Sequence, residues 1–242
     1  MSENLQIRSI FLSTAVSFAC LFGMFSPISS TAQTKVETIP MELEPNHKIR
    51  FDNGKVRLYE VNIPKGGATL MHEHRADNFL IIFEDTEITN DLLGGKPALV
   101  KFPAGSVRFT STANGEYSHR VIVSGEKPLH LIAMELLSIA PKTTTAANPR
   151  RDPPFNIMLE NSRARVYKIT LAPGESTDSF IRPAGAVLFA ISSGRIRETT
   201  DSMSERLWDF ESGNFKWFET SEKLSLKNES NIPIDLVEVD VF

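Results

Sequence analysis

The segment NGKVRLYEVNIPKGG, from Asn53 to Gly67, recurs 108 residues further along the chain as NSRARVYKITLAPGE, from Asn161 to Glu175. The two segments align without a gap, and Tyr59 falls on Tyr167. In both, apolar residues alternate with polar ones ahead of a Pro and a Gly, the pattern of a half-buried β-strand that ends in a turn. Self-similarity of this kind indicates a duplicated structural unit.

Two further blocks repeat in the same order. KFPAGSVRF, which begins at Lys101, aligns at the same spacing with DFESGNFKW, which begins at Asp209. EKPLHLIAMEL, from Glu126, aligns with NIPIDLVEVDV, from Asn231, after a deletion of three residues. Three blocks in one order are hard to obtain by chance, so the chain is predicted to hold two similar units.

Frequent Val, Ile, Thr and Phe in short runs, broken by Gly, Pro, Asn and Asp, predict an all-β fold. Between the units, SIAPKTTTAANPRRDPP is typical of a linker. Its adjacent Arg150 and Arg151 are interpreted as solvated charge. The expected organisation is a leader over 1–32, a first unit over 33–137, a linker over 138–154 and a second unit over 155–242.

The N-terminus has the layout of a secretory signal, with Arg8, an apolar run over 10–25 and small residues up to Ala32, after which we expect cleavage. The protein is expected to be secreted or periplasmic without a stable membrane span, an uncleaved membrane anchor being the alternative. The only cysteine, Cys20, lies in this run, so the mature chain would have no disulfide. A net charge of −4 without basic clusters argues against nucleic acid as a partner.

The tripeptide His72-Glu73-His74 is the strongest chemical signal in the chain. Alternate residues of a strand point to the same face, so both imidazoles would project together and Glu73 would face the surface. A further histidine, His119, opens another apolar run that extends to Val123. Paired imidazoles on one strand face have the geometry of metal ligands.

Around these histidines the sequence resembles the cupin superfamily, whose first motif is G-x5-H-x-H-x3-4-E-x6-G and whose second contains P-x-G and a third ligand histidine. Gly66, His72 and His74 match the first motif, and Pro103 and Gly105 match the second. The resemblance implies two tandem double-stranded β-helix (jelly-roll) barrels, of which the second is degenerate. Cupins commonly form dimers through edge strands, so a homodimer is an open expectation.

The chain also departs from the family motifs. The motif glutamate falls at Asn78 or Phe79, with Asp77 one position early, and Arg108 stands where the second motif would have its histidine. His119 takes that role if an extended loop, Thr110 to Ser118, precedes it. The resemblance therefore implies a metal held by His72, His74 and His119, with Asp77 as a candidate fourth ligand. Asn78 and Arg108 are expected to bind substrate.

Three neutral imidazoles suit one divalent transition metal, namely iron, manganese, zinc, copper or nickel, and leave positions open for a small-molecule ligand. By resemblance, the expected chemistry is of the oxygenase or isomerase type on a small organic molecule. The alternative is a non-catalytic small-molecule binder that uses the same cavity. The two remaining histidines, His47 and His130, are expected to be structural or exposed.

In the second unit, Phe180, Arg182 and Leu224 stand at the ligand positions, so no transition metal is expected there. Its cavity is predicted to be packed with aromatic side chains: Phe180, Phe189, Trp208, Trp217 and Phe218. Arg182 and Arg195 could instead receive an anion, which is a minor hypothesis.

Overall fold

A computed structural model describes residues 36–138 and 149–242 of the chain. The expected leader and residues 139–148 of the expected linker lie outside the described residues. The described elements are β-strands and one short 3-10 helix, as the alternation of apolar and polar residues predicts. Among the described residues we find no helix with the length and apolar character that crossing a membrane requires.

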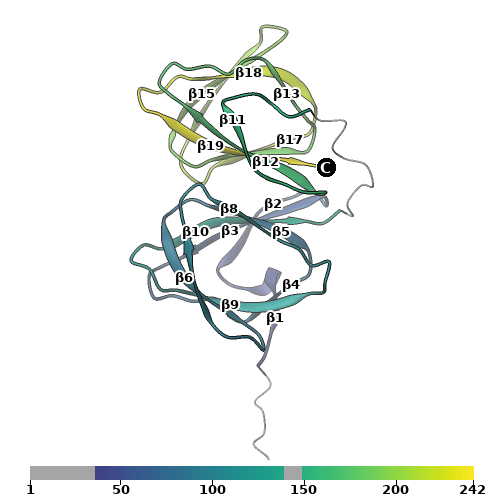
Figure 1. Cartoon of the computed structure of the whole chain (residues 1–242), viewed down its shortest axis with the longest axis vertical. Helices are drawn as coiled ribbons and strands as arrows, with labels where there is room; N and C mark the ends of the chain where they lie inside the picture. Colours follow the sequence, from purple (N-terminus) through teal and green to yellow (C-terminus); the bar gives the residue numbers. More distant parts are fainter. Residues whose placement is uncertain (1–35, 139–148) are drawn as a thin grey trace, which may run out of the picture. The chain divides into compact units, whose positions relative to one another are not determined.

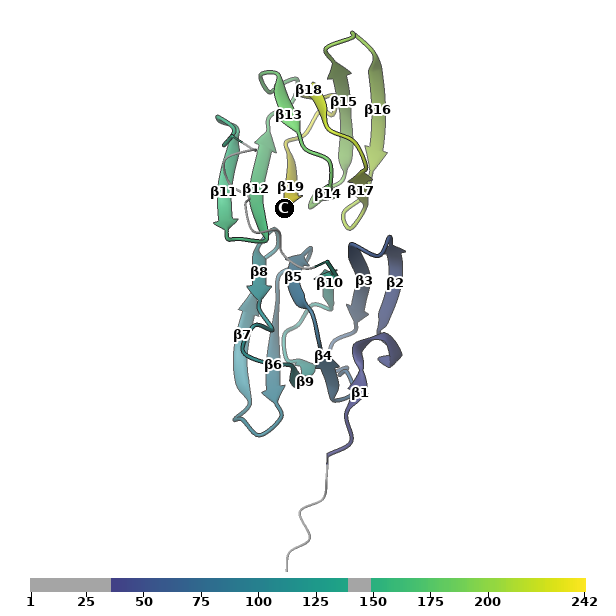
Figure 2. The same cartoon turned by 90° about the vertical axis from the view of Figure 1, so that its right-hand side faces the viewer.

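The first barrel comes from the first half of the chain (Figure 1, purple to teal). Its elements are β1 (Ile39–Pro40), η1 (Met41–Leu43), β2 (His47–Asp52), β3 (Val56–Ile63), β4 (His72–His74), β5 (Asp77–Ile82), β6 (Thr86–Leu92), β7 (Ala98–Phe102), β8 (Val107–Thr110), β9 (Tyr117–Val123) and β10 (Leu129–Leu136). They form two five-stranded sheets, in the orders β1-β4-β9-β6-β7 and β2-β3-β10-β5-β8. In Figure 2 the pairs β2–β3 and β6–β7 form opposite walls of this barrel.

The second barrel repeats this plan. Its elements are β11 (Phe155–Glu160), β12 (Ala164–Leu171), β13 (Phe180–Arg182), β14 (Ala186–Ala190), β15 (Gly194–Thr200), β16 (Glu205–Phe210), β17 (Phe215–Phe218), β18 (Glu222–Asn228) and β19 (Ile234–Val241). They form sheets in the orders β11-β12-β19-β14-β17 and β13-β18-β15-β16. The chain is thus all-β with two tandem double-stranded β-helix barrels, as expected.

Strand register bears out the alignment of the repeats. Tyr59 pairs with Ala133 across β3 and β10, and Tyr167 pairs with Glu238 across β12 and β19. Tyr59 and Tyr167 are 108 positions apart, whereas Ala133 and Glu238 are 105 positions apart. The difference of three is the deletion in the sequence alignment. The duplicated sequence blocks therefore form equivalent ladders.

The strand-ending glycine of the repeat has a conformational reason. Gly66 and Gly174 have φ angles of +75° and +74°, a region that L side chains rarely adopt. Gly66 lies in the turn from β3 toward β4, and Gly174 lies in the turn from β12 toward β13, which are the strands of the ligand positions.

One apolar cluster is built from both barrels. It contains the outward-facing residues of β3, β5 and β10 together with those of β12, β14 and β19, among them Leu58, Phe79, Met134, Val166, Phe189 and Val239. Strands buried on both faces are apolar at successive positions, which explains the runs in β10 and β14. Phe189 and Trp217 belong to this cluster, so the prediction that they line the second cavity is wrong; Phe180, Trp208 and Phe218 do belong to the second interior.

Because this cluster joins the barrels, we expect them to unfold together. Phe189→Ala should lower the free energy of unfolding by about 3–5 kcal/mol, the usual effect of truncating a fully buried phenylalanine. Urea unfolding followed by tryptophan fluorescence and by circular dichroism should give one coincident transition. Leu99→Ala, on an exposed position of β7, is the control and should change the free energy of unfolding little. Two transitions, of which only one moves, would show that the barrels unfold independently.

Candidate metal site

Three histidines of the first barrel meet because β4 and β9 are neighbours in one sheet. His72 and His119 are directly paired across the two strands, and His74 lies two residues along β4. The ring centroids are 4.6 Å apart for His72 and His119, 4.8 Å for His74 and His119, and 5.0 Å for His72 and His74. The three side chains thus converge as the strand alternation predicts.

Hydrogen bonds set the tautomer of two of these rings. Nδ1 of His72 lies 2.9 Å from the carbonyl oxygen of Leu70, and Nδ1 of His119 lies 2.7 Å from Oδ1 of Asn90 on β6. Both partners accept, so each Nδ1 carries the proton and each Nε2 keeps a free lone pair. A partner of this kind on the far nitrogen is the usual support of a metal-binding histidine.

The Nε2 atoms face a common point. Those of His74 and His119 are 2.9 Å apart, and Nε2 of His72 is buried without a hydrogen-bond partner in the described parts of the chain. One ligand atom from each of the three residues lies within 4.8 Å of the others. Two nitrogens bound to one metal at about 2.1 Å with a right angle between the bonds are about 3 Å apart. The residues present therefore fit a transition metal held by three imidazole nitrogens.

Burial keeps the three imidazoles neutral. Loss of solvation lowers the pKa of His72 to about 4, that of His74 to about 2 and that of His119 to about 3, and the neighbouring histidines lower the values further. Only the neutral ring has a lone pair to offer, so the site is ready for a cation at neutral pH.

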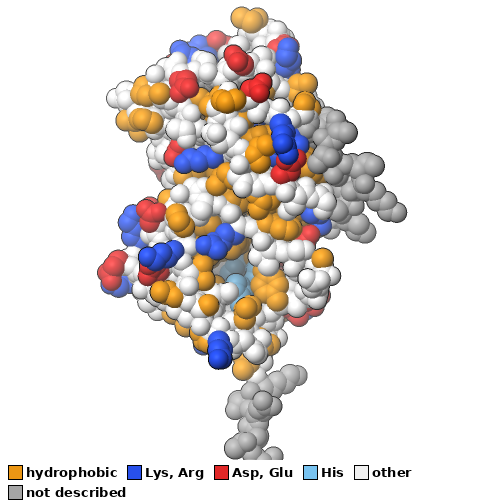
Figure 3. Space-filling model, in the orientation of Figure 1, with side chains coloured by type: hydrophobic (Ala, Val, Ile, Leu, Met, Phe, Trp, Pro, Cys, Tyr) orange, Lys and Arg blue, Asp and Glu red, His pale blue; other side chains and the backbone are white. Residues whose placement is uncertain are grey.

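The histidines line a cavity of about 450 Å³ inside the first barrel. Figure 3 shows histidine atoms, in pale blue, deep in an opening bordered largely by hydrophobic side chains. The apolar part of the wall comes from Val61, Leu80, Ile88, Leu92, Val100, Phe102, Val121, Leu129, Leu131 and Ala133. The site can therefore exclude water from most of a small organic ligand.

Two further residues singled out from the sequence, Asn78 and Arg108, also line this cavity. Asn78 is buried, and its side-chain amide lies 3.5 Å from Nδ1 of His74 and 3.2 Å from the hydroxyl of Tyr117. Arg108 is the one permanently charged side chain among the described lining residues. Its guanidinium lies over the ring of Phe102 and donates a hydrogen bond to the carbonyl oxygen of Lys101.

The expectation that Asp77 is a fourth ligand is corrected by the structure. Asp77 precedes Asn78 on β5 and so points to the opposite face of the sheet. Oδ1 accepts hydrogen bonds from the backbone and hydroxyl of Thr112 and from the hydroxyl of Ser111, and Oδ2 pairs with Arg163 at 3.0 Å. The carboxylate therefore holds the loop after β8 and bridges to the second barrel.

Sequence reasoning missed two groups that lie against the triad. The ring of Tyr117 stacks on His74, with centroids 4.7 Å apart and planes 5° from parallel. His47, expected to be structural or exposed, lines the cavity with its ring 4.8 Å from that of His72, and the buried carboxylate of Glu44 lies 2.7 Å from its Nδ1. Tyr117 could have been found from its place two residues before His119 on one strand face, whereas nothing near His47 in the sequence points to the site.

The second barrel places Phe180 opposite Leu224, in the pairing that His72 and His119 have in the first. Arg182 stands at the position of His74 and is fully buried. It donates to Glu198 at 2.8 Å and to Glu238 at 3.1 Å.

These pairs neutralise the guanidinium of Arg182, so the hypothesis that it receives an anion is wrong. Arg195 pairs with Asp209 on the surface and does not enter the barrel. Arg151 was interpreted as solvated, but its side chain is 6% exposed and pairs with Glu238 and Asp240. Arg150 is exposed, as expected.

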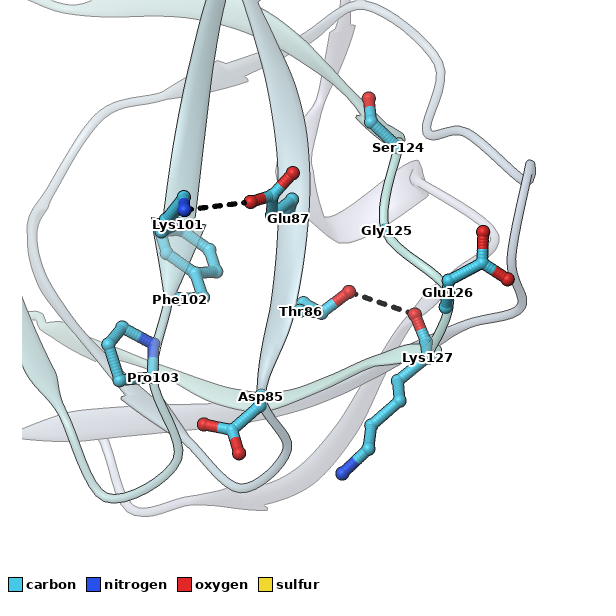
Figure 4. Close-up of a pocket in the computed structure, with 10 residues that line it drawn as sticks. All are labelled: Asp85, Thr86, Glu87, Lys101, Phe102, Pro103, Ser124, Gly125, Glu126 and Lys127. Atoms are coloured by element: carbon cyan, nitrogen blue, oxygen red, sulfur yellow. Dashed lines mark hydrogen bonds and ion pairs between the residues drawn. The ribbon is translucent and has the colours of Figure 1, made fainter.

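A hollow of about 480 Å³ also lies on the outside of the first barrel (Figure 4). Lys101 pairs there with Glu87, and the hydroxyl of Thr86 donates to the carbonyl oxygen of Lys127. These polar groups are thus already engaged, and the metal-ligating side chains of the described residues lie instead in the histidine cavity.

Arg182→Ala should destabilise the protein strongly, because it leaves the carboxylates of Glu198 and Glu238 buried with less compensation. Breaking a buried ion pair typically costs about 3–5 kcal/mol of unfolding free energy. Chemical denaturation measures this, with Arg195→Ala as the matched control in which a solvent-exposed pair is lost and little should change. Equal effects of the two substitutions would contradict a central role for the buried network.

No protein-family model matches the chain, and neither does a curated protein. Solved structures are similar in fold. AerE from Microcystis aeruginosa has a TM-score of 0.58 at 11% identity, over 78% of this chain and 88% of AerE. The protein YhaK from Escherichia coli has a TM-score of 0.56 at 19% identity, over 80% of this chain and 90% of YhaK.

Oxalate decarboxylase from Bacillus subtilis has a TM-score of 0.51 at 11% identity, over 77% of this chain and 68% of the decarboxylase. Matches of this extent take in both barrels, and at these identities they show the fold alone. Together with the strand order and the paired repeats, they identify the chain as a two-barrel protein of the cupin fold.

Proposed function

We propose that the first barrel binds one divalent transition metal through Nε2 of His72, His74 and His119 and acts there on a small organic anion with a largely apolar body. The observation that carries this proposal is the convergence of three buried, neutral imidazoles whose Nε2 atoms face one point, with that of His72 lacking a partner in the described parts of the chain. A neighbour in fold, Bacillus subtilis oxalate decarboxylase, has Mn(II) centres, which supports a metal role for such a cavity.

The charge of the site favours an anion. Three neutral imidazoles leave both positive charges of a divalent metal uncompensated, and the carboxylate of Asp77 is engaged elsewhere. Arg108 adds a further positive charge at the cavity wall. A carboxylate, enolate or phenolate would meet both groups, while its hydrocarbon part would contact the apolar wall.

A bound metal would supply Lewis-acid activation of a ligand oxygen, or redox chemistry if the metal is iron, manganese or copper. The chain's own residues orient the ligand: Arg108 attracts its anionic group, and the apolar side chains exclude water from its body. The ring of Tyr117 stacks on His74, and the amide of Asn78, which also donates to the hydroxyl of Tyr117, lies beside Nδ1 of His74, so both residues fix the orientation of this ring. This arrangement suits an oxygenase-type or isomerase-type reaction, and we propose that it operates in the extracytoplasmic space after removal of the leader.

Untagged wild-type protein should contain about one transition metal per chain by elemental analysis. His72→Ala and His119→Ala should each lose it, because either change removes one of three ligands. His130→Ala is the control: it removes a histidine of the same barrel that contacts Phe83 and Glu60 away from the cavity. Unchanged metal content in the two triad variants would overturn the site.

Oxygen uptake and product formation over a panel of phenols, enols and small carboxylates then separate an enzyme from a binder. Turnover that is lost in His119→Ala supports catalysis at the triad. Ligand-induced stabilisation without turnover over the whole panel would instead identify a binding protein that uses the same cavity.

Asn90→Ala should weaken metal binding about 10- to 100-fold, because the carboxamide oxygen fixes the tautomer and the orientation of His119. Competition with a chromophoric chelator measures the dissociation constant. Asn62→Ala, on an exposed position of β3, is the matched control and should leave the constant unchanged. An equal affinity of the two variants would show that Asn90 does not support the ligand.

A further inference from the structure

Arg151, just ahead of β11, sends its guanidinium into the second barrel. Nη1 donates to Glu238 at 2.8 Å, and Nη2 lies 2.6 and 2.7 Å from the two carboxylate oxygens of Asp240. Both acids are buried, and within residues 36–138 and 149–242 the cation that pairs with Asp240 is Arg151. Charge-assisted contacts of this geometry are strong and specific for the planar fork of a guanidinium.

Three aromatic rings complete the surroundings of this group. The guanidinium carbon lies 4.7 Å from the ring centroid of Tyr167, 4.8 Å from that of Phe180 and 5.0 Å from that of Phe155. The rings come from three different strands, β11, β12 and β13, and the two acids from a fourth, β19. Several aromatic faces around a cation, together with carboxylates, form the type of cage with which proteins bind cationic ligands.

This cage occupies the place of the metal cavity in the repeat. Phe155 and Phe180 correspond to His47 and His72 at the spacing of 108 residues, and Glu238 corresponds to the cavity-lining Ala133. The interior of the second barrel thus has aromatic and acidic side chains at positions that line the metal cavity in the first barrel.

We propose that the second barrel holds a guanidinium-binding site that the chain's own Arg151 fills as an internal ligand. The strap Pro149–Pro154 is thereby fastened to the barrel, and a free guanidinium compound binds the same site once Arg151 is removed from it. The site is independent of the metal in the first barrel and takes a different class of ligand.

The buried carboxylates that contact Arg151 supply the driving force for binding a free guanidinium compound. Burial and the adjacent carboxylate of Glu238 raise the pKa of Asp240, so an unpaired negative charge there is unfavourable. Removing Arg151 leaves a cage of matching shape in which Asp240 has lost its paired cation while Glu238 still pairs with Arg182. A small guanidinium compound restores both the charge pairing of Asp240 and the stacking.

The test uses full-length Arg151→Ala with methylguanidinium chloride at millimolar concentration, and sodium chloride at equal ionic strength as the reference. We expect the variant to melt at a lower temperature than wild type and methylguanidinium to raise its midpoint saturably, with one binding event per chain by calorimetry. Wild type and Arg150→Ala, which lacks the exposed neighbour, should show neither effect. Absence of a response specific to methylguanidinium in Arg151→Ala would overturn the proposal.

Two further measurements cover a variant that folds poorly. Recovery of soluble Arg151→Ala on refolding from urea should increase with methylguanidinium and not with methylammonium, and equal recovery would overturn the proposal. Phe180→Leu added to Arg151→Ala should weaken methylguanidinium binding at least several-fold, because it removes one face of the cage. Unchanged binding in this double variant would place the ligand elsewhere and also refute the site.

Discussion

Polar groups enclosed in a β-barrel lose most of their contact with water and need partners inside it, and this requirement organises both halves of the molecule. In the first barrel the enclosed groups are imidazoles, two of which are satisfied at Nδ1 by Leu70 and Asn90. Their Nε2 lone pairs then face one another, an arrangement that a shared cation stabilises. In the second barrel, where buried carboxylates are enclosed, arginines satisfy them.

The duplicated strands show how one framework supports two interiors. His74 and Arg182 occupy the same ladder position, and so do Asn90 and Glu198. In each barrel this residue bonds a group that projects inward. The amide oxygen of Asn90 orients His119 on the adjacent strand β9, and the carboxylate of Glu198 pairs with Arg182, two strands away on β13. The two barrels share one backbone plan, and different residues at equivalent positions make the first interior suited to a metal and fill the second with ion pairs.

The apolar cluster between the barrels gives this framework its rigidity. Three strands of each barrel contribute fully buried side chains to the cluster, so the sheets that carry Asn78 and Glu238 are packed against it on their outward faces. Side chains on such sheets have little room to move, since protein interiors are packed to crystal-like density. Asp77 and Arg163 add an ion pair across the same boundary. The second barrel thus helps to hold the wall of the cavity in the first, beside any binding role of its own.

The amino-acid sequence by itself determined the all-β class, the duplication and the position of the triad, because strand alternation and a repeat are local properties that survive in one dimension. It could not determine which residues from distant strands share a face of the fold. Asp77 appeared to be a ligand and is held by Thr112 and Arg163, while His47, bonded to Glu44, lines the cavity without a sequence signal. Arg151 appeared to be solvated and is buried among residues as much as 89 positions away. Only the closure of the sheets decides these contacts, since burial and charge pairing depend on distances in space rather than along the chain.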